Sequence, residues 1–135
     1  LPITGTGEET RDFTFVGDIV DGIIRAAVNP AAIGEEFNLA SGRETQIRDL
    51  AAMINTATGN TAGIKFAPRR KWDTKSRLCA SVEKARTLIG YNPDTKFEDG
   101  LALTIDWFKE NWERIDHDAA FVPGQSSAVR QMSSK

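Results

Sequence analysis

The chain has 135 residues, 40% of them apolar, which suffices for one domain with a modest core. Its formal net charge of −2 excludes a strong general attraction to nucleic acid or to anionic membranes. A single cysteine and a single histidine exclude an internal disulfide and a zinc site built from these residue types. We therefore expect a protein of a reducing compartment, the cytoplasm, with no membrane-spanning segment, because no apolar run approaches ~20 residues.

Two β-prone segments, LPIT and RDFTFV, open the chain, and the glycine-containing loop between them predicts a hairpin or a sharp chain reversal. This loop, TGTGEE, contains G-x-G, but the third glycine of a dinucleotide-binding fingerprint would fall at Thr10. The segment also leads into a strand, and not into the N-terminus of a helix that could bind phosphate. It therefore predicts a turn whose glycines adopt positive φ, and no cofactor-binding site.

Four amphipathic helices and two further strands are predicted after this loop from apolar periodicity, caps and glycine stops. The helices are predicted to run from Asp18 to about residue 29, from Thr45 to Gly59, from Ser81 to Gly90, and from a Thr95–Glu98 capping box to Ile115. The strands are GEEFNLAS and GIKFAP, the second ended by Pro68. Because the periodicity stops at Ile115, we expect an ordered part over 1–115 and a mobile tail over 116–135.

The sequence contains no recognisable set of catalytic residues. The only tyrosine, Tyr91, has Thr95 four residues later, so no Tyr-x-x-x-Lys pair exists, and His117 has no evident triad partner. We therefore predict no catalytic residue, no cofactor-binding residue and no metal ligand in this chain.

The arginines are the candidates for ligand binding. A basic cluster at residues 69–71 adjoins Trp72 and Asp73. Arginine pairs well with phosphate and aspartate with sugar hydroxyls, but the residues alone favour a solvated basic loop with an internal Arg–Asp pair.

The order of four segments resembles the C-terminal portion of the extended short-chain dehydrogenases/reductases. These segments are GTGEETRDFTFVGDIVDGI, GEEFNLASG, RKWDTKSRLCASVEKARTLIGYNP and FEDGLALTIDWFKENW. Within that group the chain is most similar to the NAD-dependent nucleotide-sugar epimerases and dehydratases of the UDP-glucose 4-epimerase type, over residues 3–115. The resemblance implies an α/β fold: the substrate-binding lobe plus the last helix and strand of the Rossmann domain, with short mixed strands and about four helices.

The resemblance also implies roles for individual residues. The arginine of RDF lies on the diphosphate or the nearby ribose, a second arginine three before an aspartate reaches the diphosphate, and the aspartate holds the ribose hydroxyls. The position four after the aspartate and the segment before RKWD lie near the substrate. The implied substrate-binding residues are Arg11, Phe66, Arg70, Asp73 and Arg77. This chain has Lys71 and Trp72 where the family often has Pro-Gly, so Arg69 is an alternative to Arg70.

In this family the NAD-binding loop and the Tyr-x-x-x-Lys lie upstream of the matching segment. The resemblance therefore implies an isomerase that works through a keto intermediate, with NAD bound by the full-length parent and no cofactor bound by this piece. We expect the piece alone to be inactive and to bind a nucleoside-diphosphate sugar of the UDP-sugar type, together with the missing N-terminal domain. The apolar face of its first helix then predicts a homo-oligomer or an exchange of elements between copies.

Three alternatives remain open from the sequence. A nucleotide-sugar 4,6-dehydratase or decarboxylase shares the same pattern. A non-catalytic protein-interaction module would use the exposed apolar face. Nucleic-acid binding through RRKW is disfavoured by the negative net charge and by the shortness of the basic run.

Overall fold

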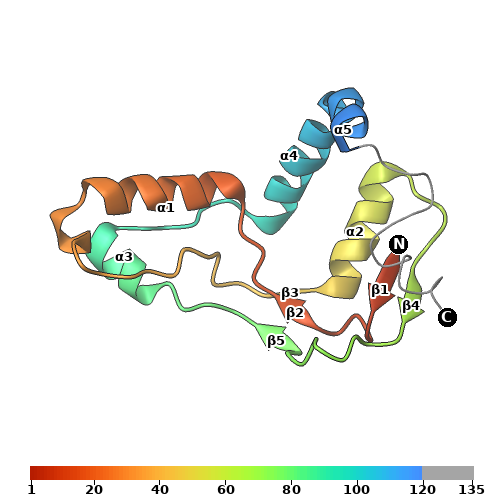
Figure 1. Ribbon diagram of the computed structural model, residues 1–135, viewed down its shortest axis with the longest axis horizontal. Coiled ribbons are helices and arrows are strands. Elements are labelled where there is room, and N and C mark those ends of the chain that lie inside the picture. Colours follow the sequence, from red (N-terminus) through yellow and green to blue (C-terminus); the bar gives the residue numbers. More distant parts are fainter. Residues whose placement is uncertain (120–135) are drawn as a thin grey trace.

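Short strands form two small sheets in the computed structural model, which describes residues 1–119 (Figure 1). Strand β1 (Pro2–Thr4) pairs in parallel with β4 (Lys65–Ala67). Strand β2 (Thr10–Arg11) lies between β3 (Thr45–Gln46), which is antiparallel to it, and β5 (Arg77–Leu78), which is parallel. The predicted hairpin is wrong, because β1 and β2 belong to different sheets. The predicted GIKFAP strand is confirmed as β4.

The four predicted helices are present, and the last of them is divided in two. They are α1 (Val16–Val28), α2 (Ile47–Thr58), α3 (Glu83–Ile89), α4 (Phe97–Glu110) and α5 (Trp112–Ala119), with a short 3₁₀ turn at Pro30–Ala32. Asn111 separates α4 from α5 with φ −106° and ψ 9°. Gly59 and Gly90 end α2 and α3 in the left-handed conformation, as predicted.

The predicted N-caps are wrong by one to three residues. The N-cap positions are Phe15, Gln46, Val82 and Lys96, and none of them makes a side-chain cap hydrogen bond. Two predicted caps make a tertiary contact instead, because the Thr95 hydroxyl donates a hydrogen bond to Asp18 Oδ1 over 3.0 Å. This contact joins the first turn of α1 to the residues that precede α4.

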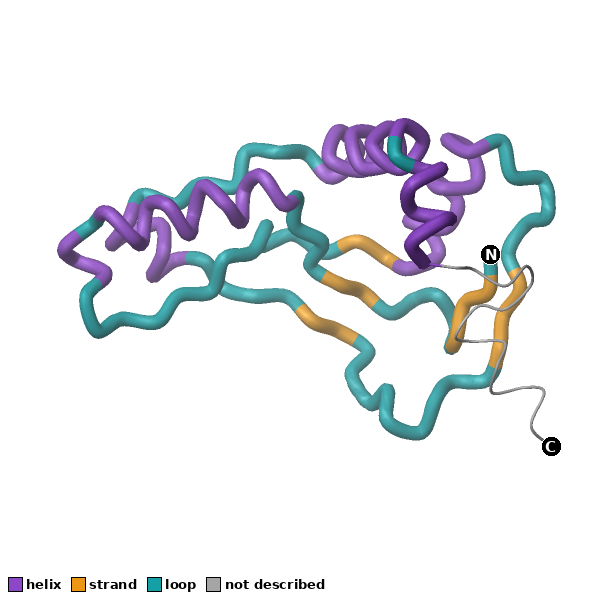
Figure 2. The backbone as a smooth tube through the Cα atoms, turned by 45° about the horizontal axis from the view of Figure 1, so that its top comes forward, coloured by secondary structure: helices purple, strands orange, loops and turns teal. Residues whose placement is uncertain are grey.

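The core lies between α1, α3 and the segment at residues 37–40. Its buried residues are Ala40, Val82, Ala85, Ile89 and Tyr91. Figures 1 and 2 show α1 and α3 side by side at one end of the molecule. The predicted GEEFNLAS strand is wrong, because no strand of the described chain lies beside it to complete a hydrogen-bonded ladder. Its inward side chains pack into this core all the same.

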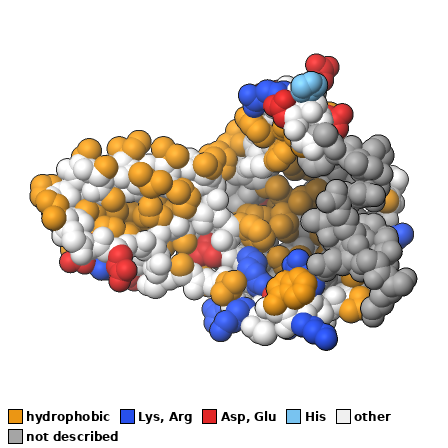
Figure 3. All heavy atoms as spheres, viewed as in Figure 1, with side chains coloured by type: hydrophobic (Ala, Val, Ile, Leu, Met, Phe, Trp, Pro, Cys, Tyr) orange, Lys and Arg blue, Asp and Glu red, His pale blue; other side chains and the backbone are white. Residues whose placement is uncertain are grey.

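Much apolar surface remains exposed. The outward face of α1 carries Val16, Val20, Ile23, Ile24 and Val28, each exposed. Figure 3 shows hydrophobic side chains along α1 and in the hollow beneath α4. Among residues 1–119, no helix is both long and apolar enough to cross a membrane. Helix α5 continues the ordered chain four residues past Ile115, and the rest of the predicted tail, 120–135, lies outside the described residues.

Candidate functional site

Arg11 lies at the centre of the three-stranded sheet, where β2 places it opposite Thr45 on one side and Leu78 on the other. Its Nη1 donates to the carbonyl oxygen of Thr10 over 2.7 Å. Its Nη2 donates to the Lys75 carbonyl oxygen over 3.1 Å and contacts Asp73 Oδ1 at 3.3 Å. Arg11 therefore ties β2 to the loop between β4 and β5, 62 residues later in the chain.

Asp73 closes a tight turn in that loop. Its backbone N–H donates to the carbonyl oxygen of Arg70 over 3.1 Å, so the two residues occupy the two ends of the turn. The Arg70 guanidinium lies over the Trp72 ring, with Cζ 5.9 Å from the ring centroid. The structure thus brings Arg11, Arg70 and Asp73 to one region, with Arg11 and Asp73 in contact and Arg70 on the solvent side.

The other two predicted substrate-binding residues lie at the edges of this region. Arg77 forms an ion pair with Glu44, with Nη2 2.6 Å from Oε2 and Nε 2.8 Å from both carboxylate oxygens. Arg77, together with the Thr10 hydroxyl, lowers the pKa of Glu44 to about 2. Phe66 lies on β4 with its ring exposed, against the loop at Gly7. Whether either residue meets a substrate stays a prediction.

The glycine-containing loop before β2 holds a carboxylate of this chain. Gly5 and Gly7 have φ of 101° and 79°, and the Gly7 N–H donates to Glu9 Oε2 over 2.9 Å. The Glu9 side chain is buried, and an added Cβ at Gly5 would overlap it. Backbone N–H groups of the loop, its own first, hold the pKa of Glu9 below its usual value against the opposing effect of burial, and the charge of Arg69 contributes further.

The N–H groups of Gly5 and Gly7 already have partners within this chain, which bears on whether the loop could bind a dinucleotide. A phosphate cradle needs backbone N–H groups aimed outward at the start of a helix. Here Glu9 receives such a group, the Gly5 N–H bonds the Ala67 carbonyl oxygen, and the chain continues into β2. The described residues therefore do not fit NAD at this loop. The Arg70 guanidinium lies over Trp72, and no ion pair is seen for Arg69 among the described residues, so the choice between Arg69 and Arg70 as the phosphate partner stays a prediction.

Asp12, which the sequence did not reveal as a candidate, follows Arg11 and bonds two other loops. Its Oδ1 accepts hydrogen bonds from the Ser41 N–H (2.9 Å) and hydroxyl (2.6 Å), and its Oδ2 accepts from the N–H groups of Gly42 (3.0 Å) and Ala80 (3.2 Å). Burial acts to raise the pKa of Asp12, but these hydrogen bonds outweigh it and hold the pKa below its usual value. A carboxylate inside the aromatic, β-prone RDFTFV run was the available signal, because such a charge requires partners.

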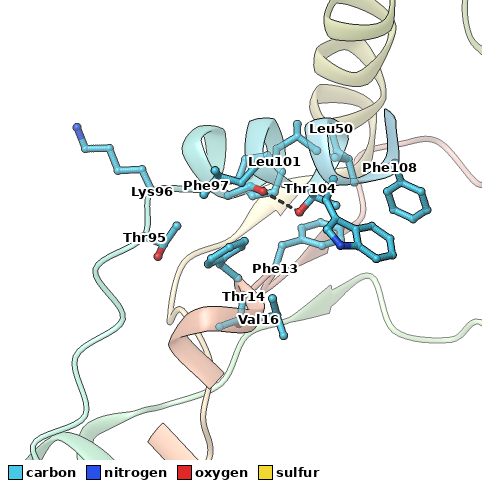
Figure 4. Close-up of a pocket in the computed structure, with 14 residues that line it drawn as sticks. Phe13, Thr14, Val16, Leu50, Thr95, Lys96, Phe97, Leu101, Thr104 and Phe108 are labelled. Atoms are coloured by element: carbon cyan, nitrogen blue, oxygen red, sulfur yellow. Dashed lines mark hydrogen bonds between the residues drawn. The ribbon is translucent and has the colours of Figure 1, made fainter. Parts of the chain in front are cut away.

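A larger, apolar hollow lies beside this polar region. It has a volume of about 640 Å³ and lies between the segment at residues 13–16 and helix α4 (Figure 4). Phe13 and Phe97 pack with ring centroids 5.6 Å apart, and Trp107 meets Phe108 edge-on at 5.3 Å. With walls of this kind, the hollow suits apolar side chains better than a charged nucleotide.

Comparisons with known proteins show which family this chain resembles and how much of a relative's length it spans. A sequence profile for the family described as GDP-mannose 4,6 dehydratase matches residues 1–104. The UDP-glucose 4-epimerase of Mycolicibacterium smegmatis is 38% identical over 108 residues, which are 79% of this chain and 34% of that protein. This chain therefore spans about a third of the length of that curated relative.

Solved structures agree with this match. The epimerase Mth375 of Methanothermobacter thermautotrophicus has a TM-score of 0.85 and 52% identity, and covers 87% of this chain and 35% of its own. A UDP-glucuronic acid 4-epimerase of Bacillus cereus, in complex with UDP-glucuronic acid and NAD, has a TM-score of 0.74 and 31% identity over 82% of this chain and 35% of its own. The similar part again amounts to about a third of each structure.

Proposed function

Because the chain belongs to the GDP-mannose 4,6-dehydratase family of extended short-chain dehydrogenases/reductases, we propose that it binds the nucleoside diphosphate of a UDP-sugar for an NAD-dependent epimerase. The observation that carries the proposal is the contact between Arg11 and Asp73 at 3.3 Å, which joins two implied ligand residues from distant segments. Arg70 lies at the other end of the Asp73 turn, so a second guanidinium is available beside the first.

The three side chains divide the ligand between them. Arg11 and Arg70 donate charge-assisted hydrogen bonds to the diphosphate, which matches the planar fork of a guanidinium. Asp73 accepts hydrogen bonds from the ribose hydroxyls. Its contact with Arg11 at 3.3 Å is longer than an optimal charged hydrogen bond, so a phosphate oxygen competes well for that guanidinium.

The hydride chemistry lies outside these residues. NAD, when bound by an upstream domain, accepts a hydride from the sugar and returns it. The contribution of this chain is to fix the position of the nucleotide, so that the sugar is presented to that domain in one orientation. We therefore propose that the 135-residue chain alone has no NAD-dependent turnover.

The exposed apolar surface of this chain is suited to contact with another protein domain. The hollow between residues 13–16 and α4, together with the outward face of α1, is apolar and is not covered by the other described residues of 1–119. We propose that the NAD-binding domain of the family covers it, and that copies of this piece associate through it when that domain is lacking. Light scattering tests this, because a strict monomer at micromolar concentration would contradict self-association.

Titration of the chain with UDP-glucose, followed by ¹⁵N–¹H correlation spectra and calorimetry, tests the binding proposal. We expect shifts at Arg11, Arg70 and Asp73. Arg70→Ala should weaken binding roughly 10- to 150-fold, the equivalent of one hydrogen bond to a charged group at ~1.5–3 kcal/mol. Arg25→Ala is the matched control, because Arg25 pairs with Asp21 on the exposed surface of α1. Equal affinities of these two variants, or no binding by the unmutated chain, would overturn the proposal.

A further inference from the structure

Trp72 is a large, solvent-exposed apolar side chain in a basic loop. Two-thirds of it is exposed (66%), and three basic residues directly precede it, with Lys75 three residues after it in the same loop. Figure 3 shows hydrophobic side chains among Lys and Arg side chains along the edge formed by the segment between β4 and β5. The exposed indole is therefore open to a partner from solution.

The turn holds Trp72 in a defined place. Its carbonyl oxygen accepts a hydrogen bond from the Thr74 N–H over 3.1 Å, and the Arg70–Asp73 hydrogen bond closes the turn around it. The Arg70 guanidinium lies over the ring at 5.9 Å, within the range of a cation–π contact. One face of the indole therefore has a cation above it, and the opposite face is the one left for a planar partner.

We infer that Trp72 is the stacking surface for the nucleobase of the bound nucleoside diphosphate. This inference rests on the proposed function, because it takes the diphosphate to lie on Arg11 and Arg70. Trp72 lies between Arg70 and the ribose partner Asp73 in the chain, so a nucleotide held by both is beside the indole. Stacking requires only a flat π face, so Trp72 adds affinity for nucleotides over inorganic phosphates without selecting one base.

Calorimetric titrations with UDP and with inorganic pyrophosphate test the role of Trp72. Trp72→Leu keeps an apolar side chain and removes the flat face, whereas Trp72→Phe keeps a smaller flat face. Trp72→Leu should weaken UDP binding roughly tenfold, within the range measured for loss of one base stack, and leave pyrophosphate binding within about twofold. Trp72→Phe should bind UDP more tightly than Trp72→Leu.

The outcomes separate this inference from the function on which it rests. If Trp72→Leu binds UDP as tightly as the unmutated chain, or loses UDP and pyrophosphate equally, Trp72 does not stack on the base, and the proposed function stands unaffected. If the unmutated chain binds neither probe, the proposed function itself fails. Loss of UDP affinity alone, with pyrophosphate affinity kept, is the result that supports stacking.

Discussion

Asparagine at position 12 would remove a carboxylate that holds two loops together while keeping its shape. In the structure, Asp12 Oδ1 accepts from two groups of Ser41, and Oδ2 accepts from the N–H groups of Gly42 and Ala80. One orientation of an asparagine amide turns its NH₂ group toward the Gly42 and Ala80 N–H groups, and the other turns it toward Ser41, whose N–H also bonds Thr14 Oγ1 and whose hydroxyl also reaches the Arg43 carbonyl oxygen. Asp12→Asn therefore replaces a charged acceptor by a neutral one at all four donors.

The expected cost follows from the loss of the negative charge at these four hydrogen bonds. A hydrogen bond to a charged group contributes ~1.5–3 kcal/mol against about 1 kcal/mol for a neutral one, and the partial exposure of these donors favours the lower end. We expect Asp12→Asn to lower the free energy of unfolding by about 2–4 kcal/mol, a large share of the ~5–15 kcal/mol typical of a domain. Urea denaturation followed by circular dichroism measures the loss, and hydrogen exchange at the Gly42 and Ala80 amides locates it.

Asp21→Asn provides the control for this experiment. Asp21 pairs with the cation of Arg25 at 2.6 Å, but both side chains are nearly half exposed on α1. An exposed pair at this spacing is worth only ~0.3–0.5 kcal/mol. If Asp12→Asn costs no more than Asp21→Asn, or if the Gly42 and Ala80 amides exchange at unchanged rates, Asp12 does not hold the two loops together.

Three further predictions concern the core and the sheet. Tyr91→Phe should cost about 1 kcal/mol in urea unfolding, because the buried hydroxyl donates to the Ala40 carbonyl oxygen over 3.0 Å; an unchanged midpoint would contradict that role. Gly22→Ala should destabilise by about 1 kcal/mol despite the better helix propensity of alanine, since its Cβ would lie 3.0 Å from the Tyr91 ring, and a raised melting temperature would refute this. Because Arg77 lowers the folded-state pKa of Glu44 from 4.5 to about 2, this pair stabilises the fold fully above pH 4.5 and ceases to do so as the pH falls to 2. The stability difference between the unmutated chain and Glu44→Gln should therefore shrink from pH 6 to pH 3, and a constant difference would contradict the assignment.

The helix ends were predictable because they depend on single residues. Gly59 and Gly90 supply the left-handed conformation in which α2 and α3 end, and Pro68 follows β4 directly. Helix starts were not predictable in the same way, because Thr95 and Asp18 bond each other across the fold. A short polar side chain is equally able to cap a helix or to make such a contact, and the local sequence does not distinguish the two.

The strands and the site depended on contacts between distant segments. β1 and β2 are near in the sequence, yet each pairs with strands far along the chain, so no local turn signal could give their partners. Arg11 and Asp73 were candidates through the family resemblance, and no spacing rule places them 3.3 Å apart. Asp12 was missed for the same reason, since its partners Ser41 and Ala80 come from two other loops.

The pairing of β2 with β5 sets the order in which this region can assemble. Arg11 meets Asp73 across 62 residues, and closing a flexible loop of that length costs about 4 kcal/mol of chain entropy. Helices α2 and α3 lie close to their own neighbours in the chain and can form before that closure. During synthesis, β2 can pair with β5 only after residues 77 and 78 have been added to the chain. The corner formed by Arg11 and Asp73 is thus completed only after this closure, and a ligand that bridges the two residues would favour the closure itself.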